Sequence, residues 1–369
     1  MRETGLDELA ERVVRAHVAP SATVAVAARA EDGWRCAHGR FSQRDLGFEP
    51  IFDLASVSKP FVAVTAARLA RAGSLSLNEA LGAYLPETAT TESAALPLIA
   101  FLSHRAGLES HRTLFAPLVA QRAFERHAAL MEAANARRAE ARGPAPASGF
   151  PPLYSDLGYL LVGAALERVM KTPLDELIER EVARPLGLAV RSARQWLRSS
   201  AGFAERVVET ETVPFRGGAV RGVVHDENAW AFAGHGAAGQ AGLFGDAESV
   251  TRFGCALLDS LSGRDDSFLH RSEIDELVRP RPLGTLRAGF DGKSDTGSSA
   301  GSRASGATFG HLGFTGTSLW CDPVAERVVV LLSNRVCPTR ENLRIREARP
   351  RVHDELFAWA EGLVSGDQP

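Results

Sequence analysis

The stretch "FDLASVSKPFVAV", residues 52–64, joins a short apolar run to a helical pattern and contains one of the chain's few lysines. Of the 42 basic residues only Lys59, Lys171 and Lys293 are lysines, and the rest are arginines. An arginine stays protonated at physiological pH, whereas a buried lysine can lose its proton and act as a base. The apolar flanks predict burial of Lys59, and burial lowers the pKa of an amine. Lys59 is therefore a candidate proton carrier.

Ser56 stands three residues before Lys59, at the expected start of a helix. Residues 57–72 carry apolar side chains at helical spacing, and Gly73 follows, where a glycine commonly ends a helix. The spacing places both side chains on one face as neighbours. The Ser56 N–H and the positive end of the helix dipole would face a developing oxyanion. The pair predicts a nucleophile and its base, although the same spacing is also common on solvated helices.

The length and composition are those of a globular protein. A chain of 369 residues exceeds the usual size of one core, which predicts two small domains or one domain with two lobes. The net charge of -3 gives no reason to expect nucleic acid or an anionic membrane as a partner. The four cysteines lack metal-type spacing and are expected as free thiols, with no metal and no cofactor.

The first twenty residues alternate charged and apolar side chains and predict a surface helix rather than a signal peptide. No run approaches the ~20 apolar residues of a membrane span. We therefore expect a cytoplasmic monomer or homodimer.

Both ends of the chain show strand patterns, and the middle shows helix patterns. Residues 21–41 predict two strands around a turn, and residues 307–335 predict two extended runs around "DPVAE". The simplest architecture closes one sheet from the two ends and inserts the helical segment between them, which is a layered α/β fold.

Within a single catalytic domain, we expect one α/β lobe and one mainly helical lobe. The α/β lobe would comprise residues 1–73 and 240–369, and the helical lobe residues 74–239. Residues 111–150 predict an alanine- and arginine-rich helix, followed by a loop-like connection, "RGPAPASGFPP", that continues to residue 152. We expect the segment to be a mobile surface insertion.

Tyr154 is one of only three tyrosines and opens "YSDLGYLLVGAALERV". It precedes a helix whose N-cap would be Ser155 or Asp156, so its side chain can project into a cleft. A serine nucleophile needs further proton carriers, and a tyrosine can be one. The alternative is an amphipathic aromatic with its hydroxyl bound to backbone. Tyr159 is expected in the helix core.

The segment "HLGFTG", residues 311–316, predicts a strand that another backbone can approach closely at its glycines. His311 could donate to a substrate carboxylate or carbonyl. A backbone N–H just after Gly313 could form the second half of an oxyanion hole. The alternative is a weak edge strand with a surface histidine.

These three elements, in this order, resemble the SxxK, YxN and KTG motif set of the serine β-lactamase and penicillin-binding-protein superfamily. The tyrosine version resembles its class C β-lactamase and family VIII esterase branch. Three further segments are similar to family segments: "LSHRAGL" at 102–108, "AGQAGLF" at 238–244 and "GFTGTSLWCDP" at 313–323.

The resemblance implies a central antiparallel sheet flanked by helices, with an inserted all-helical lobe. It implies that Ser56 is the acylated nucleophile, that Lys59 and Tyr154 shuttle its proton, and that the N–H groups of Ser56 and Phe314 form the oxyanion hole. Which of Lys59 and Tyr154 is the base stays open, because coupled groups titrate as a pair.

Two positions depart from the family pattern. Asp156 stands where many members have asparagine, and His311 stands where β-lactamases have the KTG lysine. A carboxylate near the site disfavours anionic substrates, and a neutral histidine binds a β-lactam carboxylate more weakly than lysine does. We therefore expect an esterase or a small-amide or peptide hydrolase. The alternatives are a β-lactamase or DD-peptidase, and a non-catalytic relative that binds a ligand.

Other motifs in the chain carry no chemistry. "GHGAAG", residues 234–239, matches a dinucleotide fingerprint as a string, but no strand precedes it, and a loop near the cleft is expected. His104 and His225 are expected to be structural hydrogen-bonding residues.

Overall fold

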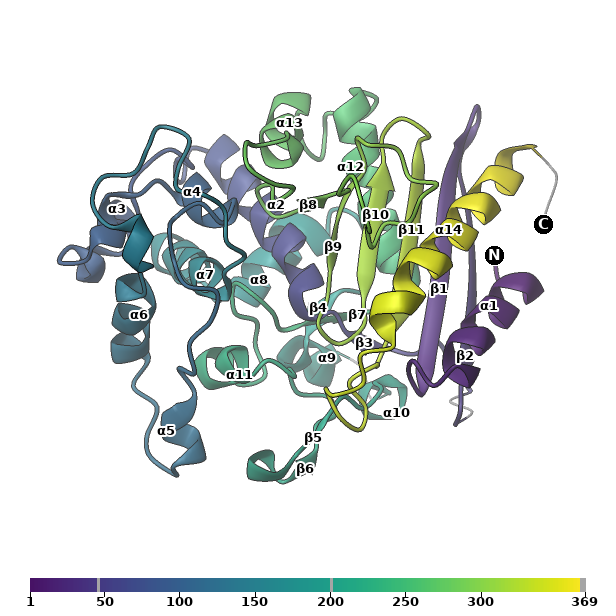
Figure 1. The fold of residues 1–369 in the computed structure, drawn as a ribbon, viewed down its shortest axis with the longest axis horizontal. Helices are drawn as coiled ribbons and strands as arrows, with labels where there is room; N and C mark the ends of the chain where they lie inside the picture. Colours follow the sequence, from purple (N-terminus) through teal and green to yellow (C-terminus); the bar gives the residue numbers. More distant parts are fainter. Residues whose placement is uncertain (45–46, 200–201, 366–369) are drawn as a thin grey trace.

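A six-stranded antiparallel sheet forms one side of the molecule (Figure 1). The computed structural model describes residues 1–44, 47–199 and 202–365. The strand order is β2-β1-β11-β10-β9-β8. The strands are β1 (Ser21–Ala30), β2 (Gly33–Ser42), β8 (Asp291–Gly292), β9 (Phe309–Leu312), β10 (Ser318–Asp322) and β11 (Arg327–Ser333). Because β1 pairs with β11, the two ends of the chain close one sheet, as predicted.

Helices cover both faces of this sheet. Helices α1 (Thr4–Arg15) and α14 (Ile345–Ser365) pack on one face, and α12 (Ala247–Ser262) packs on the other. Side chains of β1 alternate between the two cores: Val24 and Val26 face α1 and α14, whereas their neighbours face α12. The burial of both faces explains why β1 is apolar along nearly its whole length.

Helix α2 (Ser58–Arg71) lies between the sheet and the remaining helices (Figure 1). It is buried on almost every side, which accounts for its weakly amphipathic sequence. It begins one residue later than predicted, because Ala55–Val57 form a 3-10 turn, and Gly73 follows it with φ 73°.

The middle of the chain is mainly helical. Its helices are α3 (Leu81–Tyr84), α4 (Leu98–Leu102), α5 (Ala116–Val119), α6 (Arg126–Asn135), α7 (Asp156–Met170), α8 (Leu174–Ile178), α9 (Ala193–Ser199), α10 (Phe203–Arg206) and α11 (Glu227–Ala233), and α13 (Arg271–Val278) follows later. The prediction of an all-helical lobe is wrong in one respect. The two-residue strands β4 (Arg191–Ser192), β5 (Thr212–Val213) and β6 (Gly218–Ala219) also lie there, and two residues are too few to show a strand period.

The segment 111–150 is not simply a surface insertion. Helix α6 packs against α7 and buries Leu130, Ala133 and Ala134. The alanine- and arginine-rich helix expected in this segment is present, and its buried alanines allow close packing, so this part is not a mobile connection on the surface. In the part of the chain that the structure describes, no helix has the length and apolarity needed to cross a membrane.

Candidate active site

A second, three-stranded sheet positions the loop that contains Ser56. Strand β3 (Phe52–Asp53) pairs with β7 (Leu243–Gly245), which also pairs with β4. The buried Asp53 carboxylate then accepts from the N–H of Ala55 at 2.8 Å and of His225 at 2.7 Å. Ala55 has φ 47°, a left-handed conformation that costs free energy for a non-glycine residue. The Asp53 bonds hold this strained residue next to Ser56.

Lys59 lies beneath Ser56 with its side chain 0 % exposed. Its Nζ donates to Ser56 Oγ at 2.9 Å, to Asp156 Oδ1 at 2.7 Å and to the Gln240 carbonyl at 3.3 Å. Three acceptors are the full complement of an ammonium group. The loop that contains Gln240 is the one predicted to lie near the cleft.

The protonation of Lys59 differs from the prediction. Burial alone lowers its pKa, as expected, but the Asp156 carboxylate and Tyr154 outweigh burial, and the net pKa lies above the ordinary lysine value. The prediction of a lowered pKa is wrong because it left out this counter-ion. Asp156, expected to contact substrate, lines the cleft and also forms an ion pair with Lys59.

Tyr154 completes the cluster at the N-terminal end of α7. Lys59 Nζ lies 4.9 Å from the centre of its ring. Burial raises the pKa of Tyr154, nearby Lys59 lowers it and Asp156 raises it, so the net pKa is above that of a free tyrosine. Ser155 is the N-cap residue of α7, as predicted, although its hydroxyl donates to the Glu109 carbonyl instead of capping the helix.

His104 fixes the ring of Tyr154, which sequence reasoning missed. The two rings stack with centroids 4.6 Å apart. His104 Nδ1 also accepts from the N–H of Ser155 at 3.0 Å, so the residue is the structural hydrogen-bonding group that was predicted. Burial, followed by Lys59, lowers the pKa of His104 well below its ordinary value, and the ring is neutral.

The turn between β9 and β10 lies against the loop that contains Ser56. A Cβ on Gly313 would lie 1.9 Å from Thr317 Oγ1 and 2.6 Å from the Leu54 carbonyl, so only glycine fits there. Thr315 and Thr317 donate their hydroxyls to the carbonyls of Asp53 and Leu54 at 2.7 and 2.9 Å. These bonds fix the turn relative to Ser56.

Two backbone N–H groups remain available at this junction. Within residues 1–44, 47–199 and 202–365, neither the Ser56 N–H nor the Phe314 N–H donates a hydrogen bond. Both residues line the same cleft. Their positions therefore fit the predicted pair of oxyanion donors.

His311 is buried at the end of β9 and does not have the expected donor geometry. Its Nδ1 lies 2.8 Å from the Leu312 carbonyl, which can only accept, so Nδ1 holds the ring proton. Burial and nearby Lys59 lower the pKa of His311 to about 3, so the ring is neutral at pH 7. In this tautomer Nε2 can accept but cannot donate to a carboxylate.

A cleft of about 890 Å³ joins these groups. Ser56, Tyr154, Asp156, His311 and Phe314 all line it together with Gly313, and Lys59 lies just behind. One further wall comes from the connection between β11 and α14 and from the first residues of α14. The sequence did not point to its arginines, which are Arg335, Arg340, Arg346 and Arg349.

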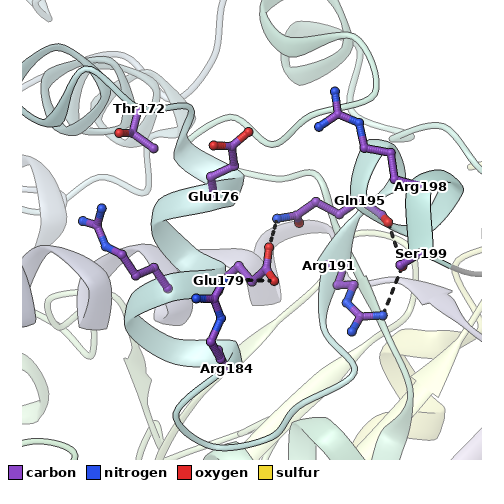
Figure 2. A pocket seen from close by; sticks show the side chains of 9 residues that line it. Thr172, Glu176, Glu179, Arg184, Arg191, Gln195, Arg198 and Ser199 are labelled. Carbon is purple, nitrogen blue, oxygen red and sulfur yellow. Dashed lines mark hydrogen bonds and ion pairs between the residues drawn. The ribbon is translucent and has the colours of Figure 1, made fainter.

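A second cavity, of about 440 Å³, lies around α8 and α9 (Figure 2). Figure 2 shows its polar groups paired with one another: Glu179 with Arg184 and with Gln195, and Arg191 with Ser199. None of the predicted site residues lines it. It is separate from the cleft at Ser56.

Comparison with protein families matches residues 6–352 to the family described as Beta-lactamase. The chain belongs to the beta-lactamase family. The family is named for a hydrolytic activity, one relative is named an amidase, and this protein is a hydrolase.

Named relatives and solved structures agree with this assignment. The chain is 28 % identical over 307 residues to an "N-acetylmuramyl-L-alanine amidase" of Bacillus subtilis (strain 168), covering 77 % of this chain and 68 % of the relative. It is also 28 % identical over 224 residues to a "Putative D-alanyl-D-alanine carboxypeptidase" of Salmonella agona (strain SL483), covering 57 % of this chain and 49 % of the relative. The chain thus spans about half the length of that carboxypeptidase.

Two solved structures share the fold at low identity. EstCE1, described as a hydrolase with promiscuous acyltransferase activity, has a TM-score of 0.66 at 20 % identity, covering 94 % of this chain and 97 % of that one. A penicillin-binding-protein homolog from Caulobacter crescentus has a TM-score of 0.65 at 19 % identity, covering 94 % and 96 %. These likenesses confirm the predicted fold class.

Proposed function

We propose that this protein is a serine hydrolase that cleaves a small ester, amide or peptide bond through an acyl-enzyme on Ser56. One observation carries the proposal: Lys59 Nζ lies 2.9 Å from Ser56 Oγ, in a cleft where the Ser56 and Phe314 N–H groups are free of other described partners. A nucleophile, a proton carrier and two oxyanion donors are the parts that acyl transfer needs.

The reaction runs in two halves. Ser56 Oγ attacks the substrate carbonyl carbon while its proton passes to the Lys59 and Tyr154 cluster, and the N–H groups of Ser56 and Phe314 hold the oxyanion. The bond to the leaving group then breaks, and the cluster returns a proton to the leaving oxygen or nitrogen. Water attacks the acyl-enzyme by the same route in reverse and releases the acid.

The base is one of two coupled groups. At neutral pH Asp156 holds the proton on Lys59, and burial holds the proton on Tyr154, because both net pKa values lie above their ordinary values. The reactive form is the one from which a proton has left this pair, and the pair titrates as a unit. Activity should therefore rise with pH on the alkaline side.

The neutral ring of His311 favours an ester or a simple amide over a β-lactam. The position where β-lactamases have a lysine offers no charge here, and Nδ1 is already bonded to the Leu312 carbonyl. β-Lactamase or DD-peptidase activity is the second candidate. It is supported by the names of a relative, a putative D-alanyl-D-alanine carboxypeptidase, and of a structural neighbour, a beta-lactamase. A non-catalytic relative is the third.

Covalent labelling separates the catalytic proposals from the non-catalytic one. We expect wild type to be labelled by a fluorophosphonate and to hydrolyse p-nitrophenyl butyrate, and Ser56→Ala to do neither. Ester turnover should exceed nitrocefin turnover in kcat/KM, and the opposite order would favour the β-lactamase. Equal behaviour of wild type and Ser56→Ala in both assays would show that Ser56 is not the nucleophile.

The location and the assembly state remain predictions of the sequence. We propose a cytoplasmic monomer or homodimer that acts on small molecules. Cell fractionation and light scattering of the purified protein test these two points directly.

A further inference from the structure

Arg349, on α14, contacts the peptide group that carries one of the two candidate oxyanion donors. Its Nη2 donates to the Gly313 carbonyl at 2.6 Å and to the Thr317 carbonyl at 2.9 Å. The Gly313 carbonyl and the Phe314 N–H belong to the same peptide. The Gly313 N–H donates to the Thr317 carbonyl at 2.7 Å, so Arg349 binds both ends of the turn.

In the described part of the chain, no carboxylate pairs with the charge of this guanidinium. Arg349 is only 9 % exposed, forms no ion pair with any described carboxylate, and its Nε has no hydrogen-bond partner in the described part of the chain. Burial and then repulsion from Arg335 lower the pKa of Arg349 to about 9, so it stays protonated at neutral pH. A buried charge without a counter-ion opposes folding, and such costs are expected at functional sites.

The chemistry of the amide links this charge to catalysis. A cationic donor on a carbonyl oxygen draws electron density from the amide nitrogen, which makes the N–H of that peptide a stronger donor. Hydrogen bonds in a chain reinforce one another in this way, by roughly 10–30 % per bond. The bond also fixes the peptide plane, so the N–H keeps its direction while the oxyanion forms.

We propose that Arg349 is a positioning residue for the oxyanion hole, which it serves by polarising and orienting the Gly313–Phe314 peptide. This inference rests on the proposed function of Ser56. Arg349 does not touch the substrate in this role. It acts through Phe314, whose N–H develops its full strength only when the carbonyl on the other side of the peptide is bound to a cation.

Arg335, which follows β11, provides a matched comparison because its side chain binds the same turn. Its Nε donates to the Phe314 carbonyl at 2.7 Å, and its Nη1 donates to the carbonyls of Arg340 and Asn342. It too has no ion pair with a described carboxylate. The Phe314 carbonyl belongs to the next peptide, which supplies no oxyanion donor. Loss of Arg335 therefore measures the effect of loosening the turn and removing a nearby charge, with the bond to the Gly313 carbonyl left in place.

The test compares Arg349→Gln, Arg349→Lys and Arg335→Gln with wild type. The measurements are kcat and KM for p-nitrophenyl butyrate, and Kd for phenylboronic acid, whose tetrahedral serine adduct places an oxygen in the oxyanion hole. We expect Arg349→Gln to lose on the order of 10- to 100-fold in kcat with little change in KM. The boronic acid should bind more weakly by a similar factor.

The other two variants separate charge from structure. Arg349→Lys keeps the charge and should recover part of the lost kcat, whereas Arg335→Gln should lose clearly less than Arg349→Gln. Melting curves show which variants are folded, and Arg349→Lys provides the measurement if Arg349→Gln does not fold. Unchanged kcat and boronic acid affinity in a folded Arg349 variant would overturn the proposal.

Two outcomes distinguish this inference from the proposed function. If wild type is neither labelled by a fluorophosphonate nor active on the ester, the proposed function fails and the inference fails with it. If wild type is active but Arg335→Gln loses as much kcat as Arg349→Gln, only the inference is overturned, because turn integrity then explains both losses.

Discussion

The two sides of the cleft differ in whether a buried cation has a carboxylate partner. On the side that would transfer the proton, Lys59 is paired with Asp156 at 2.7 Å, so its charge is compensated. On the side that would bind the oxyanion, Arg349 donates to the Gly313 and Thr317 carbonyls and forms no ion pair with any described carboxylate. The first side therefore contains an ion pair, Lys59 with Asp156, and the second side contains a positively charged guanidinium without an ion-pair partner among the described carboxylates.

This difference corresponds to two chemical tasks. A proton carrier must give and take a proton repeatedly, and a counter-ion keeps its protonated form stable between turnovers. An oxyanion exists only for an instant, so the protein must hold the compensating charge in advance and leave it unpaired until then. The comparison predicts that loss of the counter-ion on the first side shifts the pH dependence, whereas variants on the second side change the rate at every pH.

The largest effect is expected from Lys59→Arg. Arginine keeps the charge next to Asp156 and much of the volume, but it does not give up a proton. Acylation should fall on the order of 10³-fold or more, while the melting temperature stays near that of wild type. Fluorophosphonate labelling and ester turnover measure the loss. Lys171→Arg, at an exposed lysine, is the control. Near-normal activity of Lys59→Arg would mean that no proton needs to leave Lys59.

A second large effect is expected from Gly313→Ala on the oxyanion side. The new Cβ would lie 1.9 Å from Thr317 Oγ1 and 2.6 Å from the Leu54 carbonyl, so the backbone must shift and carry the Phe314 N–H with it. We expect kcat to fall by about 10²-fold, the cost of one oxyanion donor, at all pH values. Gly306→Ala is the control, because nothing lies within 4 Å of its Cβ. Equal kcat for the two variants would contradict this account.

The sequence could predict the proton-transfer side better than the oxyanion side. Ser56 and Lys59 are three residues apart, and helical geometry alone brings them together. The Lys59–Asp156 pair joins residues 97 apart, and the Arg349–Gly313 bond joins residues 36 apart. The spacing of residues within one helix or strand cannot predict such contacts. Because most of the cations in this chain are arginines, nothing in the sequence distinguishes Arg349 from the others.

The same limit applies to the fold. Strands β1 and β11 were predictable, because long runs of β-branched and apolar residues favour a strand over the other secondary structures. The two-residue strand β4 was not, since hydrogen bonds to β7 alone define it. Helix α6 was expected as an alanine-rich helix within a mobile surface insertion. Its packing against α7 was not predictable, because that contact joins residues far apart in the sequence.

A smaller, pH-dependent effect is expected from Asp156→Asn. Asp156 raises the pKa of Lys59 and also that of Tyr154, so removal of its charge lowers both. The alkaline rise of kcat/KM should then move to lower pH, by about one unit or more, whichever of the two groups is the base. The pH profile of ester turnover measures the shift, with Glu341→Gln, an exposed carboxylate at the cleft, as the control. A profile that stays in place or moves to higher pH would show that Asp156 does not set the proton affinity of the cluster.

The smallest effect is expected from His104→Phe, which keeps a ring against Tyr154 but removes the acceptor of the Ser155 N–H. A buried N–H left without a partner costs about 1–3 kcal/mol of stability, so the melting temperature should fall. The imidazole is neutral, and its loss removes no charge from the cluster. kcat should therefore fall only a few-fold, with the alkaline limb of the pH profile in place. His104→Ala, which also removes the stacked ring, should lose more kcat with the same unshifted profile. A shift of the limb in both variants would instead make His104 a titrating member of the proton-transfer side.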